Sequence, residues 1–142
     1  MEISDIRRQI LAAIERARHE AAERRVRIDE AGREYQQLLD RIAIPLFRQV
    51  AGVLRPEGYQ FAVFTPGGSV RLMSERSSED YLELTLDTSG SMPRVLGRAS
   101  RERGRRIVQS ERPIGAPGPI RDITEHDVLE FVLSELAPFV EK

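Results

Sequence analysis

The feature that most constrains the fold is a heptad repeat in the first third of the chain. Apolar and small residues recur there in alternating steps of four and three, the spacing of a helix that presents one stripe to a partner helix. Arg7 and Arg24 are the only charged positions on this stripe. The stripe, called the heptad stripe below, is formed by Ile10, Ile14, Ala17, Ala21, Ile28, Ala31, Tyr35 and Leu38. It predicts a helix from about residue 3 to residue 43.

The length of this helix indicates how it must be used. At 1.5 Å per residue it is about 60 Å long, which exceeds the diameter of a domain of about 100 residues. Part of the helix must therefore project, and a projecting apolar stripe needs a partner. We expect self-association, with a dimer favoured, or binding to another helical protein. The alternative is that the chain breaks between Val26 and Gly32 and folds back as an intrachain hairpin.

Pro45 is expected to end or kink the long helix at Ile44, because its ring opposes the preceding turn and it has no N–H. Apolar spacing then resumes and predicts a short helix over 46–54. The chain is accordingly divided into a coiled-coil-like helix, residues 1–44, and an α+β globular domain, residues 45–142.

From Tyr59 the apolar period changes to two, which predicts β-strands. The connections are too short for parallel crossovers, so the strands form an antiparallel meander. Leucines at 82, 84 and 86 define a core face, and the face carrying Glu83 and Asp87 is expected to be solvated. The five expected strands cover residues 59–65, 69–75, 80–88, 92–100 and 105–112.

A closing helix is predicted over 125–137. Thr124 and Asp127 have the spacing of a capping box, and an apolar stripe follows before Pro138. This helix is expected to cover the leucine face of the sheet. The fold class is therefore α+β, with an antiparallel sheet between helices.

Composition excludes several classes of protein. The chain contains no cysteine, which removes disulfide scaffolds, thiolate zinc sites and cysteine nucleophiles. No apolar run approaches the roughly 18 residues of a membrane span, and acids stand where a signal peptide has bases. We expect a cytoplasmic protein with no membrane association.

A search for catalytic groups is negative. His19 lies between Glu15 and Glu23 on one helix face, but that face is opposite the heptad stripe, where charged residues belong. His126 is a polar residue in the first turn of the closing helix. The glycine pair after Pro66 precedes a strand and lacks the lysine of a P-loop, so it predicts a hairpin turn. No catalytic, metal-ligating or cofactor-binding residue and no cofactor is predicted, and an enzyme is disfavoured.

The formal net charge of −1 conceals segregated charge. Residues 92–112, called the arginine hairpin below, contain seven arginines against two glutamates, a net charge of +5. Cross-strand pairing of Arg94 and Arg98 with Glu83 and Asp87 would neutralise part of this charge internally. A binding surface for an anionic partner is the other interpretation. The candidate residues are Arg94, Arg98, Arg101, Arg103, Arg105 and Arg106.

These observations favour a non-enzymatic protein–protein interaction or assembly module that self-associates through its long helix. The first alternative is a nucleic-acid or phosphate-binding protein that uses the hairpin strands 94–112. It is not favoured, because the chain is nearly neutral and no aromatic residue lies between Tyr81 and Phe131. The second alternative is a small-molecule binder or enzyme with a pocket between the sheet and the last helix.

Overall fold

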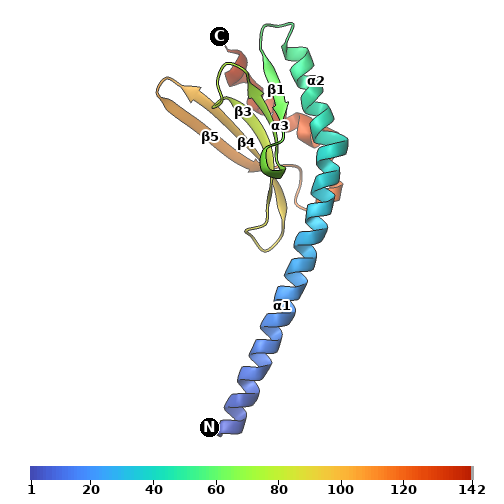
Figure 1. The fold of residues 1–142 in the computed structure, drawn as a ribbon, viewed down its shortest axis with the longest axis vertical. Helices are drawn as coiled ribbons and strands as arrows, with labels where there is room; N and C mark the ends of the chain where they lie inside the picture. Colours follow the sequence, from blue (N-terminus) through green and yellow to red (C-terminus); the bar gives the residue numbers. More distant parts are fainter. Residues whose placement is uncertain (142) are drawn as a thin grey trace.

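The computed structural model describes residues 1–141 and has a mixed α+β fold in which a long helix leads into a small domain (Figure 1). This confirms the α+β class predicted from the sequence. The helices are α1 (Ile3–Leu38), the π-helix η1 (Leu39–Ala43), α2 (Ile44–Leu54), the 3₁₀ turns η2 (Pro66–Gly68) and η3 (Ile120–Asp122), and α3 (Glu125–Val140). The strands are β1 (Phe61–Phe64), β2 (Val70–Ser74), β3 (Tyr81–Asp87), β4 (Arg94–Arg103) and β5 (Arg106–Pro113).

The sheet is the predicted antiparallel meander, with five strands in the order β1-β2-β3-β4-β5. The five expected segments all form strands, with ends that differ from the expected ones by up to three residues. The register places Leu82 opposite both Leu72 of β2 and Ala99 of β4, so one face of the sheet is apolar. β4 is longer than β1, β2 and β3, and its outer end pairs only with β5.

The long helix continues through Gly32 without a break, so the intrachain hairpin alternative is wrong. The helical path continues past Pro45 rather than ending there, but the α-helix α1 ends at Leu38 and the helix axis changes direction between α1 and α2 (Figure 1), which agrees with the expected kink. The turn just before the proline widens into the π-helix η1, in which the N–H of Ile44 donates to the carbonyl of Leu39, five residues back. This wider turn accommodates the proline ring and its missing N–H, which an α-helical turn would not. α2 then begins at Ile44 rather than at residue 46.

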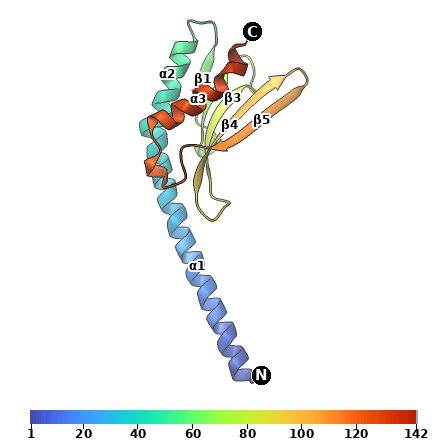
Figure 2. The ribbon, with the colours of Figure 1, turned by 180° about the vertical axis from the view of Figure 1, so that it is seen from behind.

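The core lies between the leucine face of the sheet and the helices. Figure 2 shows α3 crossing this face, with α2 beside it. Leu82 and Leu84 of β3 belong to one buried cluster with Phe131 of α3 and Phe47 of α2, which confirms the predicted packing of the closing helix. Phe131 approaches the sheet so closely that a Cβ on Gly97 would lie 2.6 Å from its ring. This position therefore requires glycine, which has no Cβ.

The start of α3 confirms the predicted capping box. The hydroxyl of Thr124 accepts from the N–H of Asp127, and the Asp127 carboxylate accepts from the N–H of Thr124. The helix continues beyond the predicted residue 137 to Val140, with Pro138 inside its last turns. A proline has a helical φ but lacks one backbone hydrogen bond. The loss is offset here because Phe139 is buried edge-on against Phe61, with ring centroids 5.9 Å apart.

The opposite face of the sheet is not uniformly solvated as expected. Glu83 is only 4% exposed, and Tyr81 is buried beside it. Arg71 on β2 lies opposite Glu83, with its Nη2 2.7 Å from Oε2, and its guanidinium covers the Tyr81 ring at 3.9 Å. A buried carboxylate is tolerated when it is paired in this way. The alternation in sequence identified the face correctly but not the arginine that covers it.

Candidate functional site

Most of α1 projects from the domain (Figure 1). Residues 1–30 are exposed, with the exceptions of Asp5, Ala12 and Ile28, which are half-buried. Apolar side chains on this segment are therefore in water. Ile10 is 54% exposed and Ile14 is 41% exposed. This segment, residues 3–28, is called the projecting segment below.

The heptad stripe is divided between two environments. Ile10, Ile14, Ala17 and Ala21 are exposed on the projecting segment, whereas Ala31, Tyr35 and Leu38 are buried in the domain of the same chain. Because the α-helix is continuous from residue 3 to residue 38, both sets lie on about the same side of it. The domain therefore packs on the side of α1 that carries the exposed stripe.

Some of the exposed apolar surface around this stripe is not among the residues predicted from the sequence. Ile6 and Leu11 are also large and exposed, and they widen the stripe near the start of the helix. Their signal was present in the sequence, because Ile6 and Leu11 occupy positions that flank the heptad stripe. Such flanking positions commonly extend a helix interface.

The arginine hairpin is partly neutralised by its own neighbours. Arg94 Nε lies 3.2 Å from Asp87 Oδ2, as the cross-strand interpretation predicts. Arg98 does not pair with Glu83, because the Glu83 carboxylate is already bound by Arg71. Arg98 binds Glu111 on β5 instead, with its Nη2 2.9 Å from Oε2. Hydrogen bonds from Ser89 and then from Arg94 lower the pKa of Asp87, and the hydrogen bond to Glu111 raises the pKa of Arg98. Both pairs are partly exposed.

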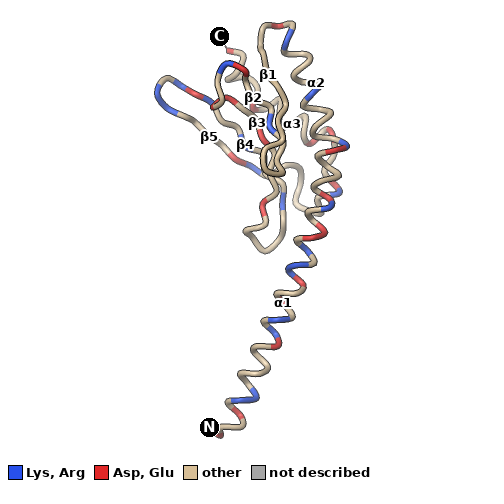
Figure 3. Tube along the Cα trace, viewed as in Figure 1, with Lys and Arg blue, Asp and Glu red and all other residues tan. Residues whose placement is uncertain are grey.

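The outer end of the hairpin, residues 101–108, is called the hairpin tip below. It extends beyond the helices and concentrates basic residues (Figure 3). Within residues 1–141, no acidic side chain lies within 4 Å of the charged groups of its four arginines. These are Arg101, Arg103, Arg105 and Arg106.

The strand register places these arginines on one side of the tip. Arg103 is opposite Arg106, and Arg101 is opposite Val108, so the three arginines share one face. Arg105 follows Gly104 in the turn. Glu102 lies on the other face, where its carboxylate accepts a hydrogen bond from Ser77 and its N–H donates to Asp80. The face formed by Arg101, Arg103 and Arg106 is called the arginine face.

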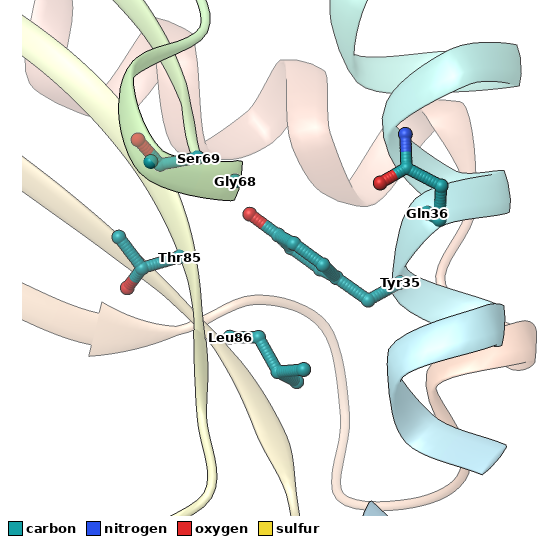
Figure 4. Close-up of a pocket in the computed structure, with 7 residues that line it drawn as sticks. Tyr35, Gln36, Gly68, Ser69, Thr85 and Leu86 are labelled. Carbon is teal, nitrogen blue, oxygen red and sulfur yellow. The ribbon is translucent and has the colours of Figure 1, made fainter. Parts of the chain in front are cut away.

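A groove of about 330 Å³ lies between α1 and the sheet (Figure 4). Tyr35 points across it, and its hydroxyl donates to the carbonyl of Leu84. Burial, with a smaller effect of the Glu83 charge, raises the pKa of this hydroxyl far above its usual value. Tyr35 is the only ionisable side chain among the lining residues described, so they supply no acid–base pair. The lining residues are Tyr35, Gln36, Gly67, Gly68, Ser69, Thr85 and Leu86.

A smaller groove of about 180 Å³ occupies the place where a pocket between sheet and last helix is expected. Arg101 and Glu135 are its charged lining residues, and Glu135 also lies 3.9 Å from Arg112. Small-molecule sites typically have volumes of roughly 300 Å³ or more. This groove is therefore smaller than a typical site of that kind.

The two histidines lie apart on the surface. His19 Nε2 lies 3.0 Å from Glu23 Oε1 on the projecting segment, and both side chains are exposed. His126 is exposed in the first turn of α3. In the part of the chain that the structure describes, no three histidine or carboxylate side chains gather in an arrangement that could hold a metal ion.

None of the described helices combines the length and the apolar character needed to cross a membrane. Comparisons with protein-family models, with curated proteins and with solved structures found no match to this chain.

Proposed function

We propose that this protein is a non-enzymatic assembly module that dimerises by pairing its projecting segment with that of a second copy. The observation that carries this proposal is the exposure of Ile10 and Ile14 on a stripe whose continuation, at Tyr35 and Leu38, is a core surface. An apolar stripe of this length costs free energy in water, and a second helix removes it from solvent. Ala17 and Ala21 allow the two backbones to approach closely.

The position of the domain favours an antiparallel pair. Each domain packs on the stripe side of its own α1, which is also the side that the partner helix would occupy. A parallel pair would therefore bring two domains into the same space above residue 28. An antiparallel pair places them at opposite ends of an overlap that covers residues 3–28.

This overlap is about 38 Å long at 1.5 Å per residue, enough for a stable helix pair. The alignment brings Arg7 of each copy near Arg24 of the other. From their positions on the stripe these long side chains reach solvent, which limits their repulsion.

Light scattering on a size-exclusion column tests the proposal. At micromolar concentration the expected mass is twice the 16.1 kDa of the chain. A clean monomer under these conditions would overturn it. The measurement needs no partner, so a dimer cannot be attributed to another protein.

Orientation can be measured separately, because the chain has no cysteine of its own. A Ser4→Cys variant carries one spin label on an exposed position of each helix. The antiparallel overlap places the two labelled backbones about 35 Å apart, whereas a parallel pair places them at the interaxial distance of about 10 Å. A measured distance of about 10 Å, the interaxial spacing of packed helices, would exclude the antiparallel arrangement and leave the dimer itself intact.

A further inference from the structure

The arginine hairpin has a different character from the projecting segment, and it suggests a second partner. We infer that the arginine face of the hairpin tip binds the phosphate backbone of double-stranded nucleic acid. The arginines of the tip differ from the others in the hairpin in whether their charge is paired. Other arginines of the hairpin are in ion pairs, Arg94 with Asp87 and Arg98 with Glu111, whereas those of the tip have no acidic partner within 4 Å among the residues described.

The basic and acidic residues of the tip lie on different faces. Arg101, Arg103 and Arg106 share one face, and the one acid of the tip, Glu102, is held on the other by Ser77. Neutralisation within the tip is therefore poor, although acid and base alternate along the sequence. Guanidinium groups donate in a planar fork that matches phosphate oxygens.

The shape of the hairpin tip also fits a duplex. Every residue of β5 is exposed, and so are residues 102–105, so the tip beyond Arg101 is a two-stranded ribbon in solvent at the edge of the sheet; Arg101 is half-buried and lines the small groove beside α3 with Val108. A ribbon of two strands fits the major groove of B-form DNA, which is about 12 Å wide. The major groove of an RNA duplex is deep and narrow, so only its phosphate backbone is open to the ribbon. Gly104, with a φ of +65°, forms the turn. Glycine is favoured at such a turn position, and only the Arg105 side chain extends at the end of the ribbon.

The side chains of the tip favour a duplex over other anionic partners. The tip contains no aromatic side chain on which unpaired bases could stack, which disfavours single strands. An acidic protein would need an apolar or aromatic anchor at the centre of its interface. The arginine face offers only the partly exposed Val108. Phosphate contacts need no such anchor.

The test is a fluorescence-anisotropy titration of the full chain with a labelled 20-base-pair DNA duplex and with an RNA duplex of the same sequence. Four arginines that each neutralise one phosphate give a slope of log affinity against log salt of about −3.6 for DNA. Affinity should therefore fall about 100-fold between about 50 and 200 mM salt. The two duplexes distinguish a DNA partner from an RNA partner.

Matched variants assign the effect to the arginine face. The double variant Arg103→Gln, Arg106→Gln should reduce the size of the slope by about 1.8. The control is Arg94→Gln, Arg98→Gln, which removes the same charge from ion-paired positions on the opposite face of β4, and it should leave the slope unchanged.

Three results would overturn the inference. They are no salt-dependent binding to either duplex, equal loss in both double variants, and binding of polyglutamate or a single-stranded oligonucleotide as tight as that of the duplexes. The last would indicate an acidic protein or an unpaired strand as the partner. The inference does not depend on dimerisation. If light scattering showed a monomer, the titration would still measure duplex binding, with one hairpin tip per molecule.

Discussion

Two parts of α1 carry the same heptad pattern but differ in burial: residues 31–38, called the upper half below, and the longer projecting segment, called the lower half. In the upper half Ala31, Tyr35 and Leu38 are buried in the chain's own core, beside the sheet and η3, while in the lower half Ile10 and Ile14 are in water. The difference does not come from side-chain size, since Ile10 and Ile14 of the exposed part are as large as the buried Leu38. A helical stripe specifies a surface that needs covering, and the tertiary structure determines what covers it.

Polar contacts reinforce the attachment of the upper half. The Tyr35 hydroxyl donates to the Leu84 carbonyl at 3.1 Å, and Glu34 pairs with Arg121 of η3 at 3.0 Å. In the lower half the ion pairs, such as Arg8 with Asp5, are local and exposed. Contacts of this local kind stabilise a helix by a few tenths of a kcal/mol and do not attach it to anything. The two halves should therefore respond differently to the same kinds of substitution.

The largest effect is expected in the upper half. Leu38→Ala should lower the free energy of unfolding by about 3 kcal/mol, because it leaves a cavity between α1 and the core. Urea unfolding monitored by circular dichroism measures this loss. The control is Val26→Ala, on the exposed back of the same helix. This control should change the free energy of unfolding by at most about 0.5 kcal/mol. Equal effects of the two variants would contradict the division of α1 into two halves.

In the lower half the same comparison concerns association. Ile14→Asp should weaken the dimer about 100-fold, equivalent to about 2.7 kcal/mol, because it places a carboxylate in the helix interface. Sedimentation equilibrium measures the change. Val26→Asp is the matched control, since Val26 is 56% exposed but lies on the side of α1 away from the stripe, and it should remain dimeric. If Val26→Asp dissociated as readily, the stripe would not be the interface.

The contribution of Tyr35 to the free energy of unfolding depends on pH. Tyr35→Phe should cost about 1 kcal/mol at pH 7, because it removes the hydrogen bond to Leu84. In the wild type the raised pKa of Tyr35 means that the unfolded state loses this proton first, near pH 10. Its contribution is therefore complete below that pH and decreases above it by up to about 1.4 kcal/mol per pH unit. Unfolding of both proteins between pH 7 and pH 11 would show the two stabilities converging; a constant difference would contradict this assignment.

The smallest effect is expected where the halves meet. Gly32 lies within the continuous helix, and a Cβ there would meet nothing within 4 Å. Gly32→Ala should raise the free energy of unfolding by about 0.5 to 1 kcal/mol, because glycine weakens a helix interior. Thermal unfolding would detect it as a higher Tm. A destabilised variant would show that the junction needs the flexibility of glycine.

Local patterns in the sequence predicted most of the elements. The Thr124 capping box, the five strands and the leucine face depend on neighbours within a few residues, and all are present. One departure is local, and the other depends on a group from a distant part of the chain. η1 accommodates Pro45, and Arg71 on a neighbouring strand covers Glu83.

For the candidate residues, too, the sequence predicted their location, and groups from distant parts of the chain determined their contacts. Composition located the arginine hairpin, and the strand register assigned its residues to faces. Which acid each arginine would bind depended on competition in space: Arg71 takes Glu83, which leaves Arg98 to bind Glu111. The tip arginines remain without acidic partners in the described structure because the register places Glu102 on the opposite face.

The sequence by itself determined a long amphipathic helix, an antiparallel meander and a segregated charge, because periodicity and charge spacing are properties of neighbouring residues. Only the tertiary structure decided which part of the heptad stripe became core and which arginines found acids. Both outcomes require segments far apart in the chain to meet, as when the carbonyl of Leu84 accepts the hydroxyl of Tyr35. The pattern of a helix states what it must bury, and the fold supplies the surface that buries it.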